Sequence, residues 1–179
     1  AGVSRSSLAR INPDGTLDLG FVPPTFNGAI TAAAVQRDGR IVAVGAFTTI
    51  NGVTKNRVAR LNADGTPDTT FINNVGTGAD QDLYSVSIQP DGRIVIGGDM
   101  ALFNGVSRNR LLRLNTDGTL DTTISTGSSV GDDVRQILVQ EDGQLLLRGF
   151  FTTVGAANTV SLGRVTPTGA VDSLFAAYG

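Results

Sequence analysis

The chain has 179 residues, of which 40% are hydrophobic and 17% charged, with a formal net charge of −2. This is long enough for one domain with a sizeable core, without the basic surplus of a nucleic-acid binder or an apolar run that could insert in a membrane. The lack of Cys and His in the sequence removes disulfides, thiolate chemistry and the usual nucleophile–base pairs. The 23 glycines and the scarcity of Glu, Lys and Met favour an all-β fold.

The chain opens AGVSRSS rather than with Met, so we expect it to be a processed or excised piece of a longer protein. One hairpin sequence, first written SLARINPDGTLDLGF, occurs four times, with glycines spaced by 50, 53 and 51 residues. A period of this size is typical of the stacked units of a propeller or solenoid. The four copies occupy residues 7–21, 57–71, 110–124 and 161–175.

The turn of this hairpin predicts its register. Asp64 and Gly65 suit a three-residue turn with a glycine bulge, which places Arg60 opposite Asp68 as a cross-strand ion pair. We interpret the pair as structural. The same frame predicts three further pairs, Arg10 with Asp18, Arg113 with Asp121 and Arg164 with Asp172.

A second hairpin, written three times at residues 29–47, 82–100 and 133–151, lies between the copies of the first. Its second strand is apolar on both faces, as expected where sheets pack against sheets. Gly45, Gly98 and Gly149 share one position, which indicates a bulge or a close approach of strands. Two hairpins per repeat predict a propeller-like repeat of four-stranded antiparallel units. We divide the single domain 1–179 into repeats at about 2–51, 52–104 and 105–156 and a partial repeat at 157–179.

The strings ARLNADGTPDTTF, SIQPDGRIVIGG and FNGVSRNRLLRLN resemble the delta-sixty repeat, a bacterial family of β-propeller type. The resemblance covers nearly the whole chain and recurs in three registers. It implies a surface-exposed or secreted protein and supplies no catalytic residues to carry over. The chain departs from the repeat at Gly155-Ala156-Ala157 and at Thr168, which predicts a capping role for the last hairpin.

The number of hairpins bears on assembly. Four copies of the first type and three of the second make three and a half blades, whereas closed propellers typically have at least four. A lone chain would leave exposed strand edges, so either the chain belongs to a longer propeller or a second copy covers the edges. We expect a closed homo-oligomer, either a trimer at a fibre tip or a dimer.

Calcium is the cofactor that the turns could accept. Residues 12–18, 62–68 and 115–121 offer oxygen atoms at alternate positions, but they lack the spacing of an EF-hand loop. Asx-stabilised turns explain the same residues, so we predict no cofactor and keep calcium as the alternative.

Recognition residues are expected in the linkers that vary between repeats and in a repeated basic row that a phosphate or acidic glycan could use. The alternatives are solvated loops and surface charge that discourages edge pairing. We predict a non-enzymatic extracellular or cell-surface recognition or adhesion module that binds a glycan or protein. The runner-up is a structural assembly domain, and a carboxylate glycosidase is third. The candidate ligand-binding residues are Asn73, Asn74, Asp80, Asp82, Asp132, Asp133, Arg5, Lys55 and Arg108.

Overall fold

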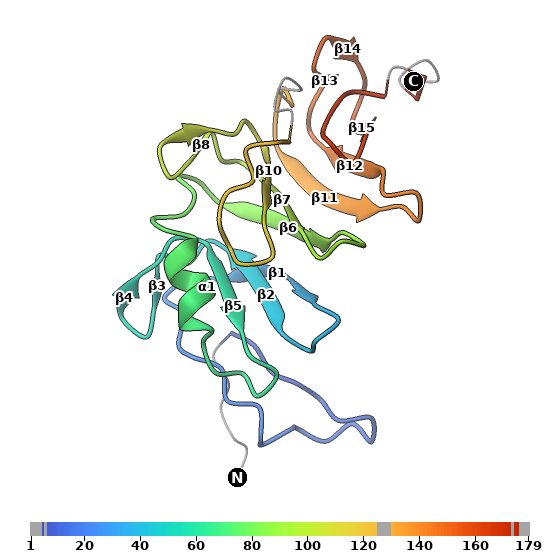
Figure 1. The fold of residues 1–179 in the computed structure, drawn as a ribbon. Coiled ribbons are helices and arrows are strands. Elements are labelled where there is room, and N and C mark those ends of the chain that lie inside the picture. The colour runs from blue at the N-terminus through green and yellow to red at the C-terminus, as the bar shows by residue number, and fades with distance from the viewer. Residues whose placement is uncertain (1–4, 6, 125–129, 173, 176–179) are drawn as a thin grey trace.

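The computed structural model describes residues 5, 7–124, 130–172 and 174–175. Three antiparallel three-stranded sheets follow one another along the chain (Figure 1), which confirms the predicted all-β, propeller-like repeat. The first sheet has the order β1 (Ile30–Val35), β2 (Ile41–Gly45), β5 (Val58–Leu61). The second pairs β6 (Leu83–Ile88), β7 (Ile94–Gly98) and β10 (Leu111–Leu114), and the third pairs β11 (Val134–Val139), β12 (Leu145–Gly149) and β15 (Leu162–Val165).

The fourth strand of each unit is reduced to a single bridge. Leu61 pairs with Pro67, and Asn62 N–H donates to the Thr66 carbonyl at 2.7 Å, so the register of this hairpin is the predicted one. Equivalent bridges join Ile11 to Leu17, Leu114 to Leu120 and Val165 to Val171. The seven expected turn glycines all have φ between 81° and 95°, where a side chain would be strained: Gly15, Gly39, Gly65, Gly92, Gly118, Gly143 and Gly169.

Three small ribbons and one helix were not predicted. The ribbons pair β3 (Thr49–Ile50) with β4 (Val53–Thr54), β8 (Leu102–Phe103) with β9 (Val106–Ser107), and β13 (Thr153–Val154) with β14 (Ala157–Asn158). Asn51 and Asn104 take left-handed φ in the first two turns, and Gly155 takes it in the third. The sequence departure at Gly155 therefore preserves the ribbon. The helix α1 (Thr69–Asn74) follows Asp68, whose carboxylate accepts the Phe71 N–H at 3.1 Å as an N-cap.

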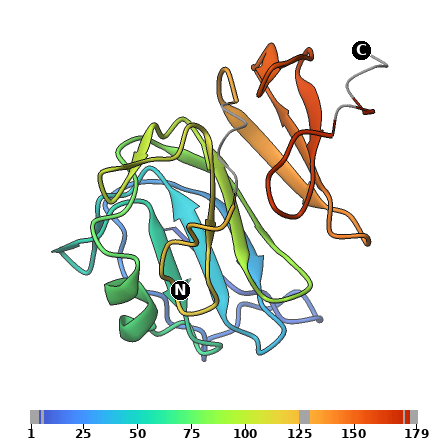
Figure 2. The same cartoon turned by 45° about the horizontal axis from the view of Figure 1, so that its top comes forward.

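The core lies between the sheets, which stack through β1, β6 and β11 (Figures 1 and 2). Strand β7 shows why its sequence is apolar on both faces. Ile94 and Ile96 pack in a cluster with the first sheet, whereas Val95 packs with the third. Each of these side chains is fully buried, which contributes about 1.5–3 kcal/mol per residue. Among the described residues, no helix is long and apolar enough to cross a membrane.

Candidate functional site

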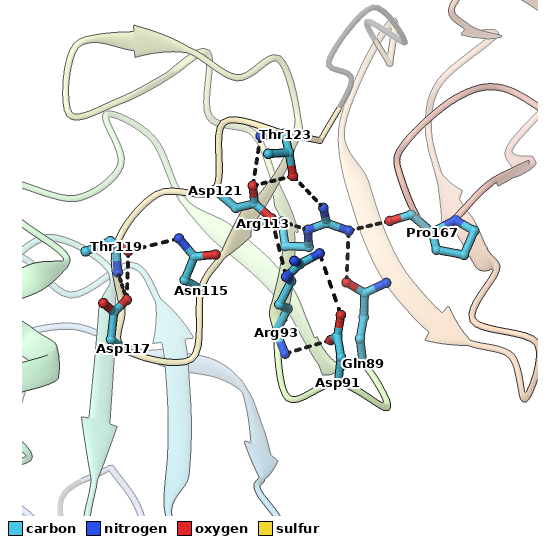
Figure 3. Close-up of polar contacts among 10 residues, drawn as sticks. All are labelled: Gln89, Asp91, Arg93, Arg113, Asn115, Asp117, Thr119, Asp121, Thr123 and Pro167. Atoms are coloured by element: carbon cyan, nitrogen blue, oxygen red, sulfur yellow. Dashed lines mark hydrogen bonds and ion pairs between the residues drawn. The ribbon is translucent and has the colours of Figure 1, made fainter.

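Each of the four Arg–Asp pairs forms an ion pair at 2.8 Å. The environment changes along the chain, because the Arg10 side chain is 42% exposed and that of Arg113 only 2%. Burial opposes ionisation of Asp121, yet hydrogen bonds from Thr123 and Arg113 hold its pKa below the usual carboxyl value. The Arg113 guanidinium also donates to Gln89 Oε1 at 3.2 Å (Figure 3).

The same arginines join neighbouring repeats. Arg60 Nη1 donates to the Thr116 carbonyl at 2.6 Å, in the turn of the next repeat. Arg10 contacts the Ala63 carbonyl in the same way, and Arg113 contacts the Pro167 carbonyl (Figure 3). These arginines therefore stabilise the stack of repeats and are already saturated by protein groups.

Several predicted binding residues have structural partners. Asp80 Oδ1 accepts the N–H groups of Ala101 and Leu102 at 3.1 and 2.9 Å. Asn74 donates to the Asp117 carbonyl at 2.9 Å, across to the next repeat. Asp132 Oδ1 accepts the backbone N–H of its neighbour Asp133 at 2.8 Å. These contacts shape the loops.

The basic residues also bond within their own repeats. Lys55 Nζ donates to Asn73 Oδ1 at 3.2 Å, Arg5 to the Phe21 carbonyl at 3.3 Å, and Arg108 to the Ser107 carbonyl at 2.7 Å. Lys55 lines a cavity of about 220 Å³ together with Asn73. Each cation has a local acceptor.

Two of the predicted carboxylates belong to a larger carboxylate–arginine cluster, which comprises Asp82, Asp99, Asp133, Arg57, Arg110 and Arg135. Asp82 and Asp133 directly precede β6 and β11, and Asp99 directly follows β7. The ion-pair distances are 3.2 Å for Arg57–Asp82, 3.0 Å for Arg110–Asp99 and 2.5 Å for Arg135–Asp133. The Tyr84 ring lies 3.8 Å from the Arg135 guanidinium carbon, and the Phe150 ring lies 5.1 Å from it. Sequence reasoning missed Arg135, Tyr84 and Phe150.

Two β-bulges hold this cluster together. The Asp82 carbonyl accepts the Asp99 N–H at 2.8 Å, and a Cβ at Gly98 would lie 2.4 Å from that carbonyl oxygen. The Asp133 carbonyl accepts the Phe150 N–H at 3.1 Å in the equivalent bulge. In the first sheet Ala29 occupies this position, so the carboxylate is particular to the second and third sheets.

Backbone strain accompanies the cluster. Arg57 and Arg110 have φ values of 68° and 65°, which is uncommon for residues other than glycine. Such strain persists only where the surrounding structure holds it, and it is concentrated at functional sites. The sequence does not reveal the positive φ itself. It does show a repeated arginine two positions after Lys55 and after Arg108, and these arginines are the two strained residues.

Asp133 is the carboxyl with a raised pKa. Burial is the main cause, and a hydrogen bond and negative charge from Asp99 raise the pKa further. We expect Asp99→Asn to lower the pKa of Asp133 towards the ordinary carboxyl value, since it removes the repelling charge. Carboxyl-carbon NMR titration measures this, with Asp91→Asn in an exposed turn as the control. An unchanged Asp133 pKa in Asp99→Asn would mean that burial alone causes the shift.

In the turns considered for calcium, one oxygen of each turn aspartate is hydrogen-bonded within the turn. Asp64 Oδ1 accepts both the N–H and the hydroxyl of Thr66 at 2.9 and 2.7 Å, and Asp14 and Asp117 repeat this arrangement. Within the part of the chain that the structure describes, no group of three acidic residues is placed to hold a metal. We expect a chelator to leave the melting temperature unchanged, as calorimetry would show. A fall of several degrees would assign these turns to calcium, because a ligand of the native state stabilises it.

Solved structures share the fold at low identity. A catalytically inactive virginiamycin B lyase from Staphylococcus aureus, solved with quinupristin, is 20% identical over 91% of this chain and 46% of its own, with a TM-score of 0.50. A protein of unknown function from Bacteroides caccae is 16% identical over 91% and 51%, with a TM-score of 0.48. PorZ, a surface component of the type-IX secretion system of Porphyromonas gingivalis, is 13% identical over 91% and 23%, with a TM-score of 0.46. The chain thus spans about half the length of the first two structures.

The prediction that the chain is not an enzyme is corrected by this comparison, because a lyase has the same fold. At 20% identity the likeness concerns the fold alone.

No curated protein matches the sequence. The profile of one family matches residues 1–21, 36–71 and 89–123, more than half of the chain. The chain therefore belongs to the β-propeller family described as domain of unknown function DUF5122.

Proposed function

We propose that this chain is a recognition module of a surface-exposed or secreted protein, and that it binds a glycan through the carboxylate–arginine cluster. The observation that carries the proposal is the convergence of Asp82, Asp99 and Asp133 with three arginines where variable linkers enter β6 and β11. Variable loops on a rigid repeated scaffold are where binding residues are commonly found.

The chemistry of the cluster suits a ligand rich in hydroxyl groups. Carboxylates accept hydrogen bonds from hydroxyl groups and guanidinium groups donate to them. The side chains of Asp82, Asp99 and Arg135 are about 40% exposed, so their free oxygen and nitrogen atoms can reach a ligand. Phe150 is 67% exposed and offers an apolar ring beside them, against which a sugar ring can pack.

A glycan-array screen followed by calorimetric titration tests the proposal. Phe150→Ala removes the exposed ring without opening the core, and we expect it to weaken binding about fivefold to tenfold. Leu19→Ala is the matched control, since Leu19 is equally exposed but lies in the first hairpin. Equal affinity of the two variants would refute a glycan site at the cluster.

The surface location and the delta-sixty assignment rest on the sequence resemblance, and they support an adhesion role. Fractionation of cells that produce the full-length protein tests the location. Recovery only from the cytoplasm would contradict it.

Acid–base catalysis is a second candidate, favoured by the raised pKa of Asp133 beside Asp99. A carboxyl that stays protonated at higher pH is what a general acid requires. Asp133→Asn separates the two candidates. It would abolish turnover of a bound glycan by an enzyme, whereas a binding module shows no turnover before or after the change.

A further inference from the structure

The turn at the tip of each first-type hairpin is here named the repeat turn, and the last three of these turns dock on the preceding first-type hairpin. The four repeat turns are residues 12–15, 62–65, 115–118 and 166–169. Besides the arginine contact, the Val22 N–H donates to the Asp64 carbonyl at 2.9 Å. A Cβ at Gly65 would lie 2.9 Å from Val22 N, and a Cβ at Gly118 would lie 2.8 Å from the Phe71 carbonyl oxygen. The docked turns are therefore tightly covered by the hairpin before them.

The first repeat turn has the same shape but is uncovered. Gly15 has φ of 85° like its equivalents, yet no atom of the described residues lies within 4 Å of a Cβ built on it. Pro13 stands where Ala63, Thr116 and Pro167 accept an arginine in the other repeat turns. The first repeat turn is therefore complementary to a hairpin that carries an Arg–Asp ion pair and a following Phe, because the arginine of such a pair donates to the carbonyl of the other repeat turns.

The last hairpin has that composition. Arg164 pairs with Asp172 at 2.8 Å and lies 4.8 Å from the centre of the Phe175 ring, but its side chain is 26% exposed. Gln140 Oε1 is buried without a hydrogen-bond partner in the described structure. The equivalent oxygens of Gln36 and Gln89 accept from the arginine that binds the next repeat turn. An unpaired buried oxygen is costly, so this site suits a further contact that the described residues do not supply.

The face of the third sheet next to Arg164 is also uncovered. Strands β2 and β7 are buried along their whole length, whereas β12 alternates between buried and more exposed residues. Leu138 and Leu162 on this sheet are 52% and 43% exposed. Arg164 pairs with Leu146, next to the β11–β12 turn, so this region is at the opposite end of β12 from Phe150. The contact region at Arg164 and Gln140 thus lies away from Phe150, whereas Leu162 pairs with Arg148 at the Phe150 end of β12.

We propose that the repeat turn at residues 12–15 of a second copy of this chain docks on the C-terminal hairpin, so that its Pro13 carbonyl accepts Arg164 Nη1 beside Gln140. Each copy offers one free turn and one free hairpin, so two copies satisfy both contacts in a closed pair. The three and a half blades of each chain become seven in the pair, within the four to eight blades of closed propellers.

Sedimentation equilibrium of the 179-residue chain tests this, with Gly15→Asn as the variant. Asparagine tolerates a left-handed φ, and the space around Gly15 is open, so the single chain is unaffected. The added side chain would collide with the docked hairpin, as a Cβ would at Gly65 or Gly118. We expect a dimer at tens of micromolar and a dissociation constant raised at least about tenfold in Gly15→Asn.

Gly52→Asn is the matched control, because Gly52 also has a positive φ and open surroundings but lies in the β3–β4 turn. It should dimerise like the unmodified chain. Arg164→Ala should weaken the dimer as Gly15→Asn does, which checks the other side of the contact. A monomeric unmodified chain, or a dimer that Gly15→Asn leaves intact, would overturn the proposal.

Discussion

Arg113→Ala is expected to lower the free energy of unfolding by about 3–5 kcal/mol, because it removes the nearer of the two arginines that pair with a buried carboxylate and leaves only Arg93, at 3.7 Å. The side chains of Arg113 and Asp121 are 2% and 4% exposed and are joined at 2.8 Å. The same substitution removes the contact with Gln89 in the second sheet and the contact with the Pro167 carbonyl, which connects the second and third sheets (Figure 3). Urea denaturation followed by circular dichroism measures the change.

Arg10→Ala is the control, since its pair with Asp18 is solvated and exposed ion pairs contribute little. We expect its stability to stay close to that of the unmodified chain. If Arg113→Ala and Arg10→Ala lower the free energy of unfolding equally, burial does not determine how much an Arg–Asp pair contributes to stability.

The pH dependence of the Arg113–Asp121 pair follows from the lowered pKa of Asp121. The folded state releases this proton more readily than the unfolded chain, so the pair stabilises the fold above the ordinary carboxyl pKa of about 3.9. That contribution is lost as the pH falls through the depressed folded-state pKa. In Arg113→Ala the stability should therefore fall less steeply with acidification.

Gly98→Ala is expected to destabilise the chain by about 1–3 kcal/mol and to disorganise the carboxylate–arginine cluster. The new Cβ would lie 2.4 Å from the Asp82 carbonyl oxygen, and backbone cannot move aside as a flexible side chain does. The bulge must open, which separates Asp82 from Asp99. Both the melting temperature and glycan binding should fall.

The control is Gly105→Ala, where φ is 75° but no atom of the described residues lies within 4 Å of the added Cβ. It should cost only the strain of a left-handed alanine, about 1 kcal/mol, and leave binding unchanged. If Gly98→Ala still binds the glycan with full affinity, the bulge is not required for the binding site.

The sequence by itself determined the features that are encoded within one hairpin. Asp64 and Gly65 specify the turn, the turn specifies the register, and the register brings Arg60 to Asp68. Doubly apolar strands such as β7 also indicated that sheets cover both faces, because only burial favours such a pattern. The carboxylates at positions 82 and 133 were found as exceptions to the repeat.

Only the tertiary structure decided what lies between repeats. The angle at which the sheets stack brings Arg60 to the Thr116 carbonyl and Arg135 to the Tyr84 ring. No local pattern encodes these contacts, since a backbone carbonyl is present at every residue and its position depends on packing. The short helix α1 was missed for a related reason, because six residues acquire helical structure from the Asp68 cap and burial of Phe71 rather than from their own propensity.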